Sequence, residues 1–61
     1  EAIDYYRLGE GQYNLSQQTP GLDRRRSLRE SALANLRKSH SMDGDRETLD
    51  FIGEIESEGI I

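Results

Sequence analysis

The sequence predicts an all-α fold, a short helical hairpin that follows a flexible or loosely ordered N-terminal segment. Apolar residues recur at helical spacing in two stretches, residues 20–38 and 45–58, which favours two amphipathic helices. A turn-rich stretch, residues 39–45, lies between them. The net charge is +4 over residues 22–40 and −6 over residues 41–61, so opposite charges would flank the apolar seam of the hairpin.

Residues 1–19 are predicted to form a short helix and a linker before the hairpin module, residues 20–61. Residues 1–8 allow one or two helical turns, and isolated helices below about 12–15 residues are marginally stable. Residues 9–21 contain three glycines, one proline and several side-chain amides, which is typical of a loop. No strand precedes these glycines and no Lys-Ser/Thr pair follows at the required spacing, so a phosphate-binding loop is not expected.

The first helix of the hairpin is predicted from Pro20 to Lys38. Thr19 supplies an N-cap, and Pro20 suits the first turn because its fixed φ is already helical. Positive charge gathers at the other end, where Lys38 and His40 meet the negative end of the helix dipole. The apolar stripe of this helix consists of Leu28, Ala32, Leu33 and Leu36.

The second helix is predicted over residues 45–58, with Asp43 or Asp45 as its N-cap. Gly53 lowers the intrinsic stability of this helix by about 1 kcal/mol relative to Ala. Gly59 is a candidate C-cap, and residues 60–61 would follow as an apolar tail. The apolar stripe of this helix consists of Leu49, Ile52 and Ile55, with Phe51 on its flank.

Large apolar residues are too few for this hairpin to be stable alone. Leu, Ile and Phe total 13 of 61 residues, and the chain has no Val, Trp or Cys. We therefore expect another protein or a second copy to complete the core, by self-association or coiled-coil pairing. We expect a non-enzymatic protein–protein interaction or oligomerisation module, and the start at Glu1 rather than Met favours a fragment of a larger protein or a processed product. The predicted apolar partner-binding residues are Leu28, Leu33, Leu36, Leu49, Phe51, Ile52 and Ile55.

A block of arginines stands out in a chain with a net charge of −4. The predicted basic partner-binding residues are Arg24, Arg25, Arg26 and Arg29. We expect them to meet an acidic protein surface, which is the 45–58 helix of the same chain, of another copy or of a partner. Residues 23–38 also resemble arginine-rich RNA-binding helices in residue type, and the resemblance implies contacts of the arginines with successive phosphates. RNA binding is therefore an alternative function, although no aromatic residue for base stacking lies in the block.

Ser27 follows three arginines and precedes Leu28. Residues 24–28 thereby resemble the Arg-Arg-x-Ser-hydrophobic pattern in substrates of basophilic protein kinases. The resemblance implies a phosphorylation site at Ser27, where phosphate would add about −1.5 to −2 charge near the helix start. In the simpler interpretation, Ser27 is an exposed helix residue without modification.

Residues 39–44 resemble a motif, Ser/Thr-x-x-x-Glu-Gly/Asn, of small helical antitoxins that block Fic-type nucleotidyl-transferases. Ser39 and Gly44 match the motif, whereas Asp43 stands where these antitoxins have Glu and is one methylene shorter. The resemblance implies a second alternative function, a regulatory inhibitor that binds and blocks an enzyme.

Catalysis and metal binding are not expected from these residues. His40 is the single histidine and Cys is absent, so neither a nucleophile–base pair nor a typical transition-metal site is available. We predict no catalytic residue, no metal and no cofactor. No apolar run approaches the ~20 residues of a membrane span, and the absence of Cys suits an intracellular protein of the cytoplasm or nucleus.

Overall fold

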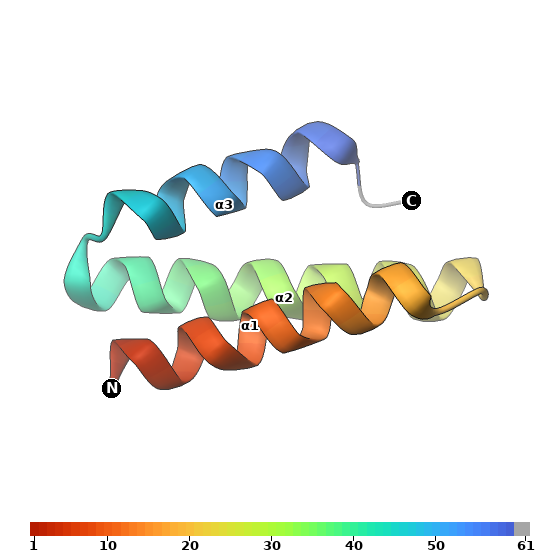
Figure 1. Ribbon diagram of the computed structural model, residues 1–61, viewed down its shortest axis with the longest axis horizontal. Helices are drawn as coiled ribbons and strands as arrows, with labels where there is room; N and C mark the ends of the chain where they lie inside the picture. Colours follow the sequence, from red (N-terminus) through yellow and green to blue (C-terminus); the bar gives the residue numbers. More distant parts are fainter. Residues whose placement is uncertain (60–61) are drawn as a thin grey trace.

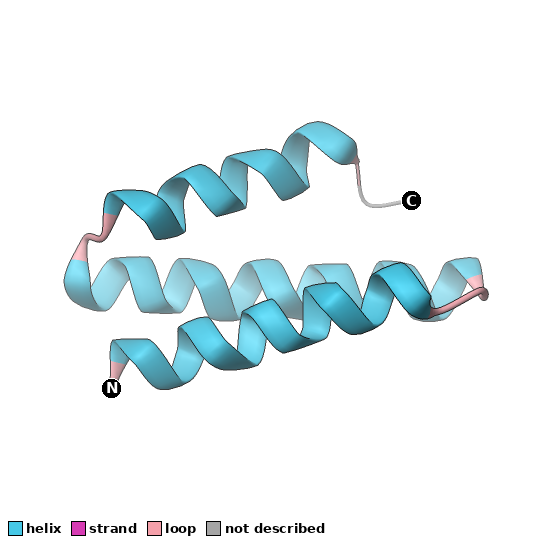
Figure 2. Cartoon of the chain, in the orientation of Figure 1, coloured by secondary structure: helices cyan, strands magenta, loops and turns pink. Residues whose placement is uncertain are grey.

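Residues 1–59 form three full helices, not a two-helix hairpin that follows a short helical segment. The computed structural model describes residues 1–59, and the predicted apolar tail at residues 60–61 lies outside them. The helices are α1 (Ala2–Gln18), α2 (Leu22–Asp43) and α3 (Arg46–Glu58), joined by two short connections (Figure 2). The all-α class is confirmed, and the predicted two-helix hairpin is corrected to a three-helix arrangement.

The N-terminal segment is a 17-residue helix and not a short helix followed by a linker. Glu1 and Asp4 start α1 with a capping box, in which each side chain accepts a hydrogen bond from the backbone of the other. Gly9 is buried where α1 crosses α2, and a Cβ there would lie 2.8 Å from Cγ of Leu36 and 3.0 Å from the carbonyl oxygen of Ala32. Gly9 was one of the residues from which a loop was predicted, but it allows the two helix backbones to approach closely. This close packing offsets the poor helix propensity of glycine.

The connection between α1 and α2 differs from the predicted cap. Thr19 ends α1, and its hydroxyl donates to the carbonyl of Leu15 at 2.8 Å. Gly21 is the N-cap of α2, so the expected roles of Thr19 and Pro20 at the start of α2 are wrong. The chain needs these residues to reverse direction between two antiparallel helices. Arg25 completes the connection by donating from Nε and Nη2 to the carbonyl of Thr19, at 3.2 and 3.1 Å.

The connection between α2 and α3 is shorter than the predicted turn over residues 39–45. α2 continues to Asp43, and Gly44 then closes it in the left-handed conformation, with φ of 67°. The amide of Gly44 donates to the carbonyl of His40 at 2.7 Å, so His40 lies in the last turn as expected. Asp45 caps α3 by accepting from the amide of Glu47, which confirms one of the two predicted caps.

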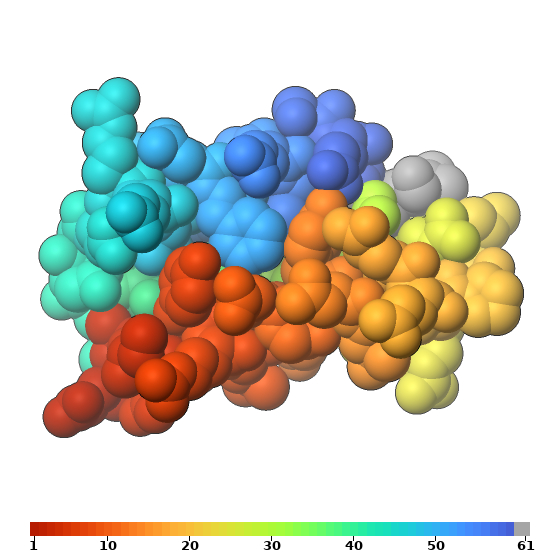
Figure 3. All heavy atoms as spheres, viewed as in Figure 1, coloured from red at the N-terminus to blue at the C-terminus, as the bar shows by residue number. Residues whose placement is uncertain are grey.

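α2 lies at the centre of the arrangement, and the other two helices pack on it (Figure 1). Both are antiparallel to α2, so α1 and α3 run in the same direction. The space-filling view shows their side chains approaching one another across the face turned to the viewer (Figure 3). The buried apolar core combines residues of all three helices: Tyr13, Ala32, Leu33, Leu36, Ile52 and Ile55. α1 therefore covers apolar surface that we expected a partner or a second copy to cover.

Candidate functional site: a groove between α1 and α3

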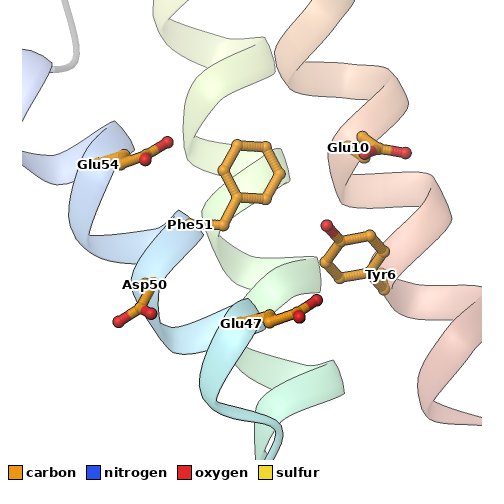
Figure 4. Close-up of a pocket in the computed structure, with 6 residues that line it drawn as sticks. All are labelled: Tyr6, Glu10, Glu47, Asp50, Phe51 and Glu54. Atoms are coloured by element: carbon orange, nitrogen blue, oxygen red, sulfur yellow. The ribbon is translucent and has the colours of Figure 1, made fainter.

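A hollow of about 350 Å³ lies between α1 and α3, which both pack on α2. Figure 4 shows the side chains that line it, two from α1 and four from α3. These residues are Tyr6, Glu10, Glu47, Asp50, Phe51 and Glu54. Their chemistry is of two kinds, aromatic rings and carboxylates.

Aromatic rings form the floor of the groove. Phe51 of α3 packs edge-on against Tyr13 of α1, with ring centroids 5.4 Å apart and an interplanar angle of 86°. The same ring lies 6.1 Å from the centroid of Tyr6, also on α1. Such pairs stabilise a contact by about 0.5–1.5 kcal/mol beyond their area burial. Tyr6 and Phe51 are only partly buried, so this aromatic surface stays accessible from outside.

Carboxylates form the rim of the groove. Glu47 and Glu54 are seven residues apart in α3 and share one side of it, and Figure 4 shows Glu47 extending toward Tyr6. Asp50 lies on α3 but points away from the rings, and Glu10 stands on α1 across the groove. None of these four exposed carboxylates makes an ion pair with a residue of the described part of the chain.

The pKa of Tyr6 reports the environment of the groove. Burial raises the pKa of its phenol above the ordinary value of 10.0, and the carboxylates of Glu10, Glu47 and Asp45 raise it further. A neighbouring negative charge disfavours the phenolate, which is why the three carboxylates act in the same direction as burial. Burial and the neighbouring carboxylates therefore both keep the phenol of Tyr6 neutral.

A hydrogen-bonded network fastens all three helices beside one end of the groove. The hydroxyl of Tyr13 donates to Oε1 of Glu58 at 2.5 Å. Arg29 of α2 donates to Oγ of Ser16 on α1 and to the carbonyl of Gly59 after α3, both at 3.2 Å. The guanidinium of Arg29 also lies 5.5 Å from the ring centroid of Tyr13 and 4.0 Å from Glu58. The network keeps α3 next to α1 and so maintains the groove.

The predicted block of basic residues is divided in the structure. Arg29 belongs to the network just described, and Arg25 holds the α1–α2 connection. Arg24 and Arg26 are exposed and make no ion pair within residues 1–59. Because they are two positions apart on a helix, their side chains point about 160° away from each other. Binding of a partner by these four arginines stays a prediction.

The predicted apolar partner-binding residues also fall into different environments. Four of them, Leu33, Leu36, Ile52 and Ile55, are buried in the core of the chain itself. Leu28 and Phe51 are partly buried, and Leu49 is 48% exposed. Phe51 is the member of this set that lines the groove.

The remaining sequence candidates lie on or between the helices. Ser27 is exposed on α2, within the second turn of the helix. Ser39, the first residue of the antitoxin-like stretch, is 1% exposed and therefore covered by the helices around it. Asp43 ends α2, and its carboxylate accepts from the amide of Asp45 at 3.0 Å.

The sequence did not predict the groove, because α1 was not expected to be a long helix. One signal for α1 is present in hindsight, since Tyr6, Gly9, Tyr13 and Ser16 recur at spacings of 3 and 4. Glycine and serine do not register as core-facing residues in an apolar pattern. Without α1, nothing places Glu10 or Tyr6 opposite α3.

Within residues 1–59, no group of three or more His, Cys, Asp or Glu side chains is arranged to hold a metal ion. None of the helices in this range combines the length and the apolar character needed to cross a membrane. Comparison of the chain with known protein families, with curated proteins and with solved structures gives no match.

Proposed function

We propose that the chain is a non-catalytic protein-interaction module whose groove between α1 and α3 binds a positively charged segment of another protein. One observation carries the proposal: an accessible aromatic floor, Tyr6 and Phe51, lies beside exposed carboxylates, of Glu10, Glu47 and Glu54, that form no ion pair with a described basic residue. A lysine or arginine side chain suits such a surface, because its apolar stem packs on the rings while its charged end meets the carboxylates.

The expected interaction is modest in strength and dependent on charge. A cation near an exposed aromatic face contributes about 0.5–1 kcal/mol. The carboxylates add long-range attraction, which mainly raises the association rate and selects the sign of the partner's charge. A groove lined by six residues is smaller than the surface of a permanent interface, so we expect transient binding.

The charge of the rim favours a different protein over a second copy that docks groove to groove. In such a symmetric dimer, the carboxylates of one copy would face those of the other. Like charges placed opposite each other cost several kcal/mol across an interface. A cationic partner meets no such penalty.

A titration with a basic peptide tests this proposal. A nine-residue peptide of alternating Lys and Ala is added to the ¹⁵N-labelled chain, and amide shifts are followed at two salt concentrations. We expect shifts centred on Tyr6, Glu47 and Phe51, and weaker binding at high salt because exposed charges are screened beyond about 10 Å at 0.1 M.

Two variants of equal net charge provide the control. Glu47→Gln/Glu54→Gln removes two rim carboxylates, whereas Asp23→Asn/Glu30→Gln removes two exposed carboxylates of α2. The proposal predicts that only the first variant loses binding. Equal loss in both variants would mean that the peptide responds to net charge alone, and the groove would have no binding role.

A further inference from the structure

We infer that the partner segment is an α-helix, seated lengthwise between α1 and α3, with two cations seven residues apart and an apolar residue between them. The inference rests on the proposed function, and it adds the conformation and the spacing of the ligand.

The spacing of the rim carboxylates matches that of side chains on a helical ligand. Glu47 and Glu54 are separated by two helical turns, which is about 10.5 Å along the axis at 1.5 Å per residue. A helical partner running alongside α3 has the same rise, so its side chains at i and i+7 match both carboxylates. Same-face side chains of an extended segment recur about every 6.6 Å, and no multiple of that distance equals the separation.

The position of Phe51 favours an apolar ligand residue between the two cations. This residue lies four positions after Glu47 and three before Glu54, so its ring sits between the two carboxylates along the groove. A partner residue at i+3 or i+4 would therefore contact Phe51 and Tyr6. Since both rings are partly accessible, an apolar residue at that position would bury more of the aromatic floor.

The arrangement of the helices favours a ligand helix that lies along α1 and α3. α1 and α3 run in the same direction and both pack on α2 (Figure 1), and residues of both helices line the hollow. A helix seated in it would contact both and complete a four-helix arrangement, in which amphipathic helices pack by their apolar stripes. Glu10 on α1 would then lie on the opposite side of the bound helix, where a third cation could be paired.

Three peptides of the same length and net charge separate this inference from simple charge attraction. Each has about 18 residues in an Ala/Gln background, since shorter isolated helices are marginal. The first carries Lys at i and i+7 with Leu at i+3 and i+4. The second moves the later Lys to i+5, about 140° away around the helix. The third exchanges a central Ala for Pro, which breaks the helix.

Affinities are measured for the full chain by fluorescence anisotropy, and helicity by circular dichroism. We expect the first peptide to bind roughly tenfold tighter than the other two and to gain helicity on binding. Glu47→Gln/Glu54→Gln should abolish this advantage, whereas Asp23→Asn/Glu30→Gln should preserve it.

Other outcomes contradict the inference in distinguishable ways. Equal affinity for all three peptides would overturn the helical ligand and leave the proposed cation-binding groove intact. No binding of any basic peptide would overturn both. Sedimentation of the chain alone supplies a further check: a dimer that dissociates in the Glu47→Gln/Glu54→Gln variant would make the occupant a second copy, against the inference.

Discussion

Gly9 determines how closely α1 approaches α2. Its neighbours across the interface are the side chain of Leu36 and the backbone carbonyl of Ala32, and the carbonyl cannot move without shifting α2. Gly11 lies two residues further along the same helix and has open space around it. The two glycines therefore form a natural matched pair.

We predict opposite effects of alanine at these two positions. Gly11→Ala should stabilise the fold by about 0.5–1 kcal/mol, because alanine is the better helix former. Gly9→Ala gains the same propensity but forces an overpacked contact that costs about 1–3 kcal/mol, so the fold should be destabilised by about 1 kcal/mol. Urea unfolding followed by circular dichroism measures both values. Stabilisation by both variants would contradict the close packing of α1 on α2.

Arg29 and Arg26 form a second matched pair, one mostly buried and the other exposed. The side chain of Arg29 is 11% exposed and donates hydrogen bonds to two other parts of the chain, whereas Arg26 is exposed. We predict that Arg29→Gln destabilises the fold by about 1–3 kcal/mol, because hydrogen-bond partners at Ser16 and Gly59 are left unpaired. Arg26→Gln should change stability by less than about 0.5 kcal/mol. Thermal unfolding of both variants makes the comparison, and equal effects would contradict the network.

The tyrosines make the fold sensitive to high pH. Burial raises the pKa of Tyr6 and of Tyr13, and for Tyr13 the hydrogen bond to Glu58 adds to the effect. A raised folded-state pKa means that the neutral phenol is favoured in the fold. The resulting stability is complete below the unfolded value near 10 and is lost as the pH rises through the folded-state pKa.

Tyrosinate absorbance at alkaline pH measures this effect. We predict that part of the absorbance change occurs at higher pH in the folded chain than in urea, and that unfolding accompanies it. Identical titration curves in buffer and in urea would contradict the burial of Tyr13 and the partial burial of Tyr6.

At the level of the helices, the amphipathic stripe of α3 is the simplest to test. Ile52 is 5% exposed in the core, and Leu49 is 48% exposed, one turn earlier on the same helix. We predict that Ile52→Asp unfolds the chain, because a buried carboxylate without a partner is severely unfavourable. Leu49→Asp should leave helicity largely unchanged. Circular dichroism distinguishes them, and loss of helicity in both variants would contradict the assigned core face of α3.

The helices also differ in how well the sequence predicts them. α3 agrees with the prediction because an apolar stripe, an Asp45 cap and a terminal Gly59 all indicate the same boundaries. α2 was predicted over most of its length, but its end was placed at Lys38 because Ser39 and its neighbours favour turns. For α1 only the first turns were predicted, because the stability of the rest comes from tertiary packing of small residues, which local propensity does not contain.

At the scale of the whole molecule, only some of the opposite charges of α2 and α3 pair with each other within the chain. Glu56 pairs with Arg37, and Glu58 lies near Arg29, so one flank of α3 meets α2 as the charge pattern predicted. The other acidic residues of α3, Glu47, Asp50 and Glu54, are exposed and make no ion pair within residues 1–59. Two of these carboxylates, Glu47 and Glu54, form the rim of the groove. The groove itself could not be predicted until α1 was placed beside α3.

A charge exchange between the groove and its ligand tests the central claim most directly. The chain and its Glu47→Lys/Glu54→Lys variant are each titrated with the helical peptide that carries Lys at i and i+7, and with the same peptide carrying Glu there. We predict that the original chain binds the Lys peptide, that the variant binds the Glu peptide, and that both mixed pairings bind at least roughly tenfold more weakly. Similar affinity in all four pairings would contradict a groove that selects its partner by the charge of Glu47 and Glu54.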